Sequence, residues 1–197
     1  YKRQDLWVGM PPSVYAASAG ATIIVNLSAS DETIGKADYR RMLVKSQSGR
    51  NVCAYIYADA GTGESTTDMV FAGHNLIAEN ASVLSESLPF SKGRATAEID
   101  ASFLAAERRK LTTFTGTETP SDFIVTKAGF CGDGELTLRK VSKTPFVPQE
   151  NIQLGERAEL ILSIQAQGLA RRLSHTGAKT AVIGISGGLD SSLALLV

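Results

Sequence analysis

The segment AVIGISGGLDSSLALLV, residues 181–197, places the heptapeptide SGGLDSS between two apolar runs. The first run, within KTAVIGI at 179–185, predicts a buried strand, and the second run predicts a helix. Glycines after a strand allow the backbone to turn with positive φ and let another group approach the main chain. The first amides of a helix lack intrahelical partners and lie at the positive end of its dipole. Together with the serine hydroxyls, these features predict a pocket for phosphate oxygens.

The heptapeptide differs from the common phosphate-binding loop GxxxxGK[ST], because no lysine follows Gly188. Asp190 stands there instead, and its carboxylate would repel phosphate unless a cation lay between the two groups. Magnesium is the expected cation, since proteins hold it with one or two carboxylates and the phosphate oxygens of the substrate. A simple strand-to-helix turn with a Ser or Asp cap is the structural alternative. Such a turn requires fewer of these residues, so we favour phosphate binding.

The overall composition indicates a globular protein that binds small molecules or other proteins. Hydrophobic residues make up 43% of the 197 residues, and 20 Lys and Arg balance 20 Asp and Glu. Zero net charge without a basic stripe argues against nucleic acid as a partner. The sequence has no apolar run of the roughly 18 residues that span a membrane, and no basic-then-apolar leader. We therefore expect no membrane partner and a cytoplasmic location.

The cysteines and histidines predict neither a disulfide framework nor a zinc site. Cys53 and Cys131 form no CxxC pair, and neither His74 nor His175 has a neighbouring set of ligands. Cys53 lies within NVCAYIYA, where we expect a small buried residue at the start of a strand rather than a reactive thiol.

Helices and strands alternate in the first part of the chain. The sequence predicts a helix of small residues at 13–21, a buried strand at 21–30, a helix at 35–51 and a strand at 54–60. The first of these strands ends in polar residues, which is a usual place for a binding site.

Shorter segments with partial period-two alternation follow a Gly-rich turn. Residues 68–80, 82–87 and 94–100 predict antiparallel strands that pack on one face of a sheet. A helix within 103–114 closes this part, and the Gly, Pro, Thr and Ser content after it predicts a long connection.

A second domain is expected after this connection. Apolar residues recur there at helical spacing: Ala158, Leu162, Ala166, Leu169 and Leu173. Gly177 is the expected end of that helix. We therefore predict an α/β protein with a first domain at 1–114, a linker at 115–155 and the start of a second domain at 156–197.

Two sets of motifs resemble known families. GISGGLDS, Gly184 to Ser191, resembles the SGGxDS loop of the ATP pyrophosphatases, which cleave ATP between its α and β phosphates. DLWVGMPPS at 5–13, NLSASDETIGKADYRRMLVKSQS at 26–48 and AYIYADAGTGESTTDMVFAGHNLIAEN at 54–80 resemble the glutaminase domain of the glutamine-dependent NAD synthetases. That domain belongs to the nitrilase superfamily.

The resemblance implies a fold and an activity for the complete enzyme. The fold is the carboxyl-terminal part of a nitrilase-like α-β-β-α sandwich, followed by the first βα unit of a doubly wound PP-loop synthetase domain. Such enzymes release ammonia from glutamine at a Cys, Lys and Glu triad and pass it through an internal tunnel. They then amidate nicotinic acid adenine dinucleotide with ATP and magnesium, and they are homo-oligomers.

The resemblance also implies binding residues in this chain. The expected ATP-binding segment comprises Gly184, Ile185, Ser186, Gly187, Gly188, Leu189, Asp190 and Ser191. Asp190 is also the expected magnesium ligand. Ser30 and Lys36 match the glutamine-binding serine and basic residue of the family, and the lysine would pair with the α-carboxylate of glutamine. The alternative is a loop serine and a surface lysine. Glu64, in GESTTD, is either a site carboxylate or a turn residue that accepts backbone amides.

The chain departs from the family pattern at the nucleophile. The family has CEDLW or a close variant where this sequence has RQDLW, so Arg3 stands in the place of the cysteine. The Glu and Lys of the triad belong upstream of Tyr1, and Val197 falls within the first helix after the ATP loop. Either the chain is a fragment, which we favour, or the nucleophile has been lost. We assign no catalytic residue and expect the chain alone not to hydrolyse glutamine.

Two other functions remain open at this point. A nitrilase-superfamily amidohydrolase without ligase activity would need the triad and would not explain SGGLDSS. A non-catalytic scaffold or interaction module would follow if Arg3 truly replaces the nucleophile.

Overall fold

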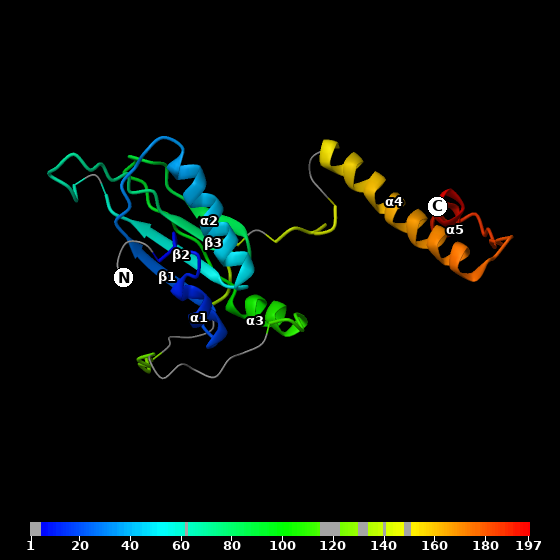
Figure 1. The fold of residues 1–197 in the computed structure, drawn as a ribbon, viewed down its shortest axis with the longest axis horizontal. Helices are drawn as coiled ribbons and strands as arrows, with labels where there is room; N and C mark the ends of the chain where they lie inside the picture. The colour runs from blue at the N-terminus through cyan, green and yellow to red at the C-terminus, as the bar shows by residue number, and fades with distance from the viewer. Residues whose placement is uncertain (1–4, 62, 115–122, 130–133, 140, 148–150) are drawn as a thin grey trace. The chain divides into compact units, whose positions relative to one another are not determined.

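The computed structural model divides the chain into two compact units, Tyr1–Arg139 and Lys140–Val197 (Figure 1). The division lies within the predicted linker. The structure describes residues 5–61, 63–114, 123–129, 134–139, 141–147 and 151–197. Arg3 and Cys131 lie outside these residues.

The first unit is built on a mixed sheet with the strand order β1-β2-β3-β4. The strands are β1 (Ile23–Ser28), β2 (Ala54–Asp59), β3 (Leu76–Glu79) and β4 (Ser82–Glu86). β1 and β2 are parallel, and the other two pairs are antiparallel. The α2 helix makes the crossover between the parallel strands, so the predicted α/β class is confirmed.

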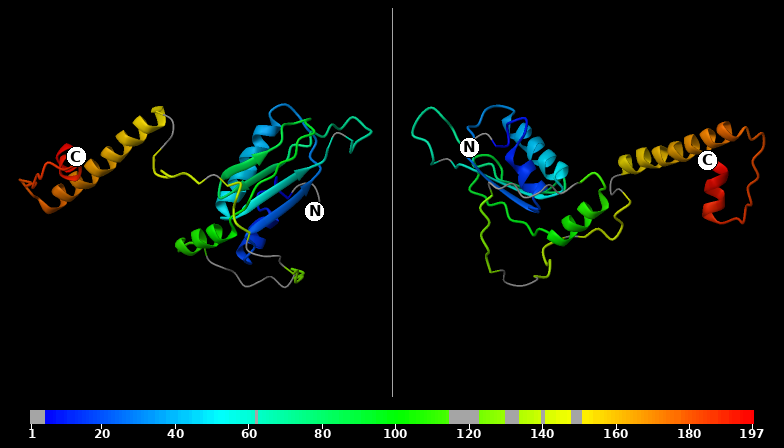
Figure 2. Two further views of the ribbon diagram at one scale, coloured as in Figure 1. Left: turned by 180° about the vertical axis from the view of Figure 1, so that it is seen from behind. Right: turned by 60° about the horizontal axis from the view of Figure 1, so that its bottom comes forward.

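Three helices accompany the sheet: α1 (Pro12–Ser18), α2 (Lys36–Arg50) and α3 (Ala101–Lys110). α2 lies on one face of the sheet, in contact with β2, β3 and β4. Seen from behind, the strands face the viewer and α2 lies beyond them (Figure 2, left). One helix layer and one sheet of the predicted sandwich are therefore present in the described residues.

The main core lies between α2 and the sheet. The buried side chains that form it are Leu6, Val44, Tyr55, Tyr57, Leu76 and Ala78. Tyr55 and Tyr57 are two residues apart on β2, so both point to the α2 side. Their hydroxyls bond to β1, because Tyr55 accepts from Asn26 Nδ2 at 3.0 Å and Tyr57 donates to Ser28 Oγ at 2.8 Å. Burial raises the pKa of Tyr55 to about 12, which keeps this hydroxyl neutral in the core.

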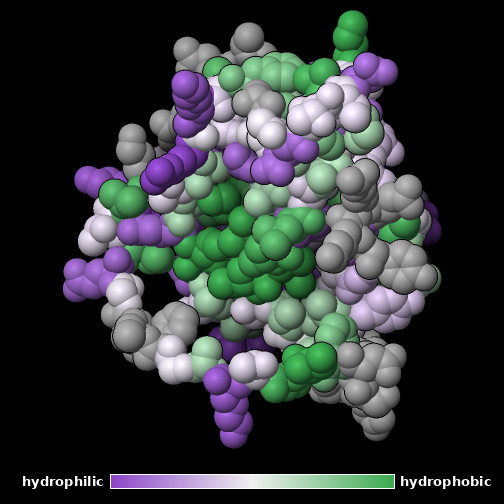
Figure 3. Space-filling view, turned by 90° about the vertical axis from the view of Figure 1, so that its left-hand side faces the viewer, coloured by the Kyte–Doolittle hydropathy of each residue, from purple (hydrophilic) through white to green (hydrophobic). Residues whose placement is uncertain are grey.

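The opposite face of β1 is apolar and exposed. Ile23, Val25 and Leu27 alternate along the strand and are 42%, 60% and 75% exposed. In a sandwich, the exposed face of β1 is the face on which a second sheet packs. Hydrophobic side chains also gather near the centre of the side of the molecule drawn in Figure 3.

Two of the predicted strands are absent from the structure. Residues 94–100 form no strand, and Asp100 instead caps α3 by accepting the Phe103 amide at 2.7 Å. Residues 179–185 form no strand either. Apolar residues alone do not make a strand, because its backbone groups need a neighbouring strand, and no strand in the described part of the chain pairs with 179–185.

Part of the predicted linker packs on the first unit. Glu98 accepts the backbone amides of Thr137, Leu138 and Arg139 at 2.8–3.1 Å. Arg139 in turn forms a bidentate ion pair with the buried Glu79. The composition of this region predicted a long connection. It gave no sign of these anchors, because they depend on partners far away in the sequence.

The second unit contains α4 (Asn151–Thr176) and α5 (Leu189–Leu196). α4 begins within the predicted linker and ends immediately before Gly177, as predicted. Gly177 has φ +66°, a conformation that favours glycine. None of the described helices is long and apolar enough to cross a membrane.

The turn between β3 and β4 contains a strained alanine. Asn80 and Ala81 have φ +43° and +69°, the left-handed values that a two-residue type I′ hairpin turn requires. Asn tolerates this region, but an alanine Cβ is crowded there.

We expect Ala81→Gly to stabilise the protein by about 0.5–1 kcal/mol. Glycine removes the clash, and the greater entropy of the unfolded chain offsets part of the gain. Urea denaturation measures the change, with Ala105→Gly inside α3 as the control, which should destabilise by a similar amount. An unchanged or lower midpoint for Ala81→Gly would contradict the assigned turn strain.

A network of charged side chains connects α2 to Glu86, the last residue of β4. Arg41 Nε donates to both carboxylate oxygens of Glu86, at 3.1 and 3.0 Å. His74 Nε2 lies 2.6 Å from Glu86 Oε1. These partners lower the pKa of Glu86, and the Arg41 hydrogen bonds are the largest cause.

We expect Glu86→Gln to destabilise the protein by about 1–3 kcal/mol at pH 7, since it removes charge-assisted hydrogen bonds. The native pKa lies below the usual 4.5, so this stabilisation is complete above pH 4.5 and is lost as the pH falls through the native value. The difference from the parent should therefore shrink as the pH falls below 4.5. Denaturation midpoints across this range measure it, and Glu64→Gln at an exposed position serves as control. A pH-independent difference would exclude this linkage.

Candidate functional site

The parallel strands β1 and β2 end side by side, and the candidate site lies at this edge. Their register pairs Ser28 with Asp59. The loop at 29–35 then leads from β1 into α2 and carries Ser30. The carboxyl ends of parallel strands are the usual place for ligands in α/β sheets.

A surface pocket of about 470 Å³ opens beside this loop. Its lining residues are Trp7, Val8, Ala29, Ser30, Asp31, Lys36 and Met69. The structure therefore brings Ser30 and Lys36, the two predicted glutamine-binding residues, to one pocket.

Lys36 is the first residue of α2, and Gly35 precedes it with φ +83°. Its Nζ donates to Asp31 Oδ1 at 2.7 Å and lies 5.3 Å from the centroid of the Trp7 ring. The hydrogen bond from Lys36 lowers the pKa of Asp31, so the Asp31 carboxylate is charged at neutral pH. The pocket thus presents a cation and an anion next to each other.

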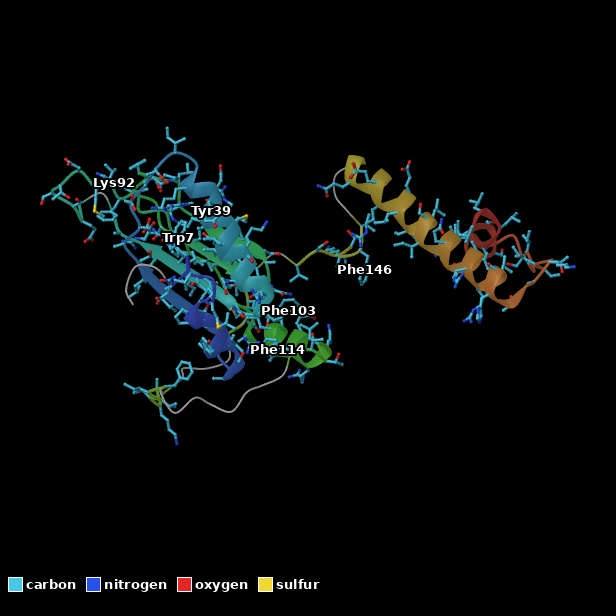
Figure 4. All side chains as sticks on the ribbon, viewed as in Figure 1. Trp7, Tyr39, Lys92, Phe103, Phe114 and Phe146 are labelled. Atoms are coloured by element: carbon cyan, nitrogen blue, oxygen red, sulfur yellow. The ribbon has the colours of Figure 1, made fainter. Side chains whose placement is uncertain are left out.

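Trp7 forms a rigid wall of the pocket. Its ring stacks on Tyr39 of α2, with centroids 5.6 Å apart and an interplanar angle of 28° (Figure 4). The neighbouring Leu6 is 2% exposed and belongs to the main core, which anchors the segment that carries Trp7.

Trp7, Asp31 and Met69 were not predicted as pocket residues. Trp7 lies within the DLW motif and Asp31 follows Ser30, so their places in the sequence could have indicated them. Met69 comes from another loop, which backbone pairing brings near: the Glu32 amide donates to Val70 O at 2.7 Å. No local signal marks such a residue.

A buried charge cluster lies directly beneath the loop. Arg40 Nη1 lies 2.9 Å from Glu32 Oε2, and Arg40 Nη2 lies 3.7 Å from Asp59 Oδ2. Asp59 Oδ1 accepts the Ser30 amide at 3.0 Å. Burial raises the pKa of Asp59, while the Ser30 amide and the Arg40 charge oppose that effect.

The cluster also determines the protonation state of His74. Arg40 Nη1 lies 2.7 Å from His74 Nδ1. A guanidinium has no acceptor, so Nδ1 accepts this bond and Nε2–H donates to Glu86. His74 is therefore neutral in this arrangement and links the two charged groups.

Two other candidate residues lie apart from the pocket. Glu64 is exposed in a turn, where its amide donates to Gly61 O at 3.1 Å, and it does not line the pocket. Cys53 is buried, as predicted, and burial raises the pKa of its thiol to about 11. It is therefore protonated and unreactive at neutral pH.

The predicted ATP-binding segment forms a loop followed by a helix. Gly187 has φ +84°, and Gly188 is the N-cap of α5. Ser186 Oγ lies 3.3 Å from Ser191 Oγ. Asp190 is exposed in the first turn of α5. Among the described residues, no group of three or more His, Cys, Asp or Glu side chains could hold a metal ion.

Comparison with known proteins covers almost the whole chain. The chain is 43% identical over 206 residues to the glutamine-dependent NAD(+) synthetase of Mycobacterium tuberculosis H37Rv, and 41% identical over 207 residues to that of Mycobacterium leprae. Each alignment covers 98% of this chain and 30% of the relative. The chain therefore spans less than a third of the length of these relatives.

A protein of known structure that is similar to this chain is also a glutamine-dependent NAD(+) synthetase. The glutamine-dependent NAD(+) synthetase from Cytophaga hutchinsonii is 31% identical, with a TM-score of 0.37, over 41% of this chain and 14% of that chain. No protein-family model matches the chain. The resemblance predicted from the motifs is nevertheless confirmed by the sequence relatives: nearly the whole chain is similar to a segment of the glutamine-dependent NAD synthetases.

Proposed function

We propose that this chain is part of a glutamine-dependent NAD synthetase and contributes to its glutamine site and its ATP site. The observation that carries the proposal is the convergence of Ser30 and Lys36 on one pocket, in a chain 43% identical to such an enzyme. A simple amidohydrolase would leave the loop at 184–191 without a role, and a scaffold would need neither site.

The pocket beside α2 is suited to the zwitterionic end of glutamine. Lys36 complements the α-carboxylate, and Asp31, 2.7 Å away, complements the α-ammonium. Ser30 offers a hydroxyl, whose only described hydrogen bond is a long one of 3.5 Å to Asp31 O. The flat face of Trp7 supports the aliphatic part of the substrate.

The loop at 184–191 is suited to ATP. The free amides at the start of α5 and the hydroxyls of Ser186 and Ser191 complement phosphate oxygens. Magnesium fits the same place, since it needs only one or two protein carboxylates when phosphates and water supply the other ligands. Asp190 would hold the ion, which neutralises charge on the phosphates.

The two sites divide the chemical work of the complete enzyme. Ammonia is mostly protonated near neutral pH, so its release from glutamine at a sheltered site supplies the reactive form. A carboxylate is a poor acyl donor, and transfer of AMP from ATP to nicotinic acid adenine dinucleotide activates it for amidation. We place the enzyme among the homo-oligomers on the basis of its resemblance to the family.

In the complete enzyme, we expect Lys36→Ala to raise the KM for glutamine by about tenfold to a hundredfold, because a charge-assisted hydrogen bond is worth about 1.5–3 kcal/mol. NAD synthesis from added ammonia should stay within about twofold of the parent, since ammonia bypasses the glutamine site. Steady-state kinetics with each nitrogen donor measure the two effects.

Lys45→Ala, at an exposed position on the same helix, is the matched control and should change neither activity. An equal loss of both activities in Lys36→Ala would assign Lys36 to folding. Unchanged use of glutamine would contradict the proposed pocket.

A separate prediction concerns the ATP loop. Asp190→Asn keeps the size and the hydrogen-bonding capacity of the side chain but removes its charge. We expect adenylation to slow by about a hundredfold, which corresponds to roughly 3 kcal/mol, while glutamine hydrolysis changes little. Pyrophosphate release at varied magnesium concentration measures the step, with Glu159→Gln on α4 as the control. If the variant released pyrophosphate at the parent rate with the same magnesium dependence, Asp190 would not be a magnesium ligand.

A further inference from the structure

The segment from Ser30 to Glu32 is tied at both ends to buried charges. At one end, the Ser30 amide donates to Asp59 Oδ1 at 3.0 Å. At the other end, the Glu32 carboxylate accepts from Arg40 Nη1 at 2.9 Å. The side chains of Asp59 and Arg40 are both 0% exposed. This segment carries one glutamine-binding residue and lies against the other.

Arg40 and Lys36 are four residues apart on α2, so they lie on the same face of the helix. Lys36 reaches the pocket at the start of α2, and Arg40 lies one turn further along, beneath the loop. The bond from Arg40 to Glu32 therefore joins the loop to the helix that carries Lys36. The bond from Asp59 to Ser30 joins the same loop to β2.

The buried charges are costly for stability. Arg40 Nε, Arg40 Nη2 and Asp59 Oδ2 have no hydrogen-bond partner within the described part of the chain. Apolar residues of similar volume commonly stabilise a core as well as or better than a buried ion pair, and unsatisfied buried polar atoms add a further penalty. Stability alone therefore gives little reason for this arrangement, whereas the geometry that it imposes on the loop does.

The Ser30 hydroxyl depends on that geometry. Its described contact, at 3.5 Å with Asp31 O, is too long to hold the side chain, so the backbone sets its position. Displacements of about 1 Å at a binding site can cost a hundredfold in rate.

We propose that Asp59 and Arg40 are positioning residues for the glutamine pocket. They do not line the pocket, and they act through the Ser30 amide and the Glu32 carboxylate. The inference rests on the proposed glutamine site and adds to it the residues that hold Ser30 and Lys36 in their positions relative to each other.

The test uses two substitutions at Asp59 in the complete enzyme. Asp59→Ala removes the acceptor of the Ser30 amide and should raise the KM for glutamine at least tenfold, while ammonia-dependent synthesis stays within twofold. Asp59→Asn keeps an oxygen acceptor at the same place, so its KM should stay within about threefold of the parent. This rescue distinguishes a positional role from loss of a charge.

Hydrogen exchange gives a second readout that does not depend on activity. In Asp59→Ala, a peptide spanning residues 28–36 should exchange at least tenfold faster than in the parent, because the Ser30 amide has lost its acceptor. In Asp59→Asn it should remain protected. Glu79→Ala is the matched control, since Glu79 is also a buried carboxylate in the same unit but binds Arg139 and the Asp100 amide. It should change neither the ratio of the two activities nor the exchange of this peptide.

Three outcomes would overturn the inference: an unchanged glutamine KM in Asp59→Ala, an equal loss with both nitrogen donors, or unchanged exchange of the peptide. Failure of the proposed function is separate, because it would appear as parent-like use of glutamine in Lys36→Ala. If Lys36→Ala loses glutamine use and Asp59→Ala does not, only the positioning role is wrong.

Discussion

The parallel pairing of β1 with β2 determines where the candidate pocket can form. Because the two strands end together, with Ser28 opposite Asp59, the loop after β1 passes directly over the end of β2. Asp59 then accepts the Ser30 amide, and α2 returns from the same loop with Lys36 at its first position. A shift of one residue in this register would turn Asp59 to the other face of the sheet and separate it from Ser30.

The pocket combines a rigid support with adaptable charges. Beneath it, Arg40 is fully buried between acidic partners and the neutral His74. At its surface, Asp31 and Lys36 are 46% and 20% exposed and remain accessible to a ligand. Such a division suits the proposed recognition of glutamine, because the loop keeps its place while the exposed ion pair exchanges partners with the substrate.

The sequence predicted helices and strands correctly where interactions between residues close together in the chain determine them. The predicted helix at 35–51 and strand at 54–60 correspond to α2 and β2, and Gly177 ends α4 as expected. The prediction failed where pairing decides: residues 94–100 and 179–185 have strand-like composition but form no strand in the structure. The ion pair between Arg139 and Glu79 could not be predicted from the sequence either, because these residues lie far apart in the chain.

The candidate site divides in the same way. By itself the sequence determined the α/β class, the loop–helix order of SGGLDSS and, through resemblance to the NAD synthetases, the identities of Ser30 and Lys36. Only the tertiary structure brought these two residues to one pocket, added Trp7, Asp31 and Met69 to its lining, and placed Asp59 and Arg40 beneath the loop. The physical reason is that motifs record residues that are neighbours along the chain, whereas strand register and helix packing decide which distant side chains come within contact distance.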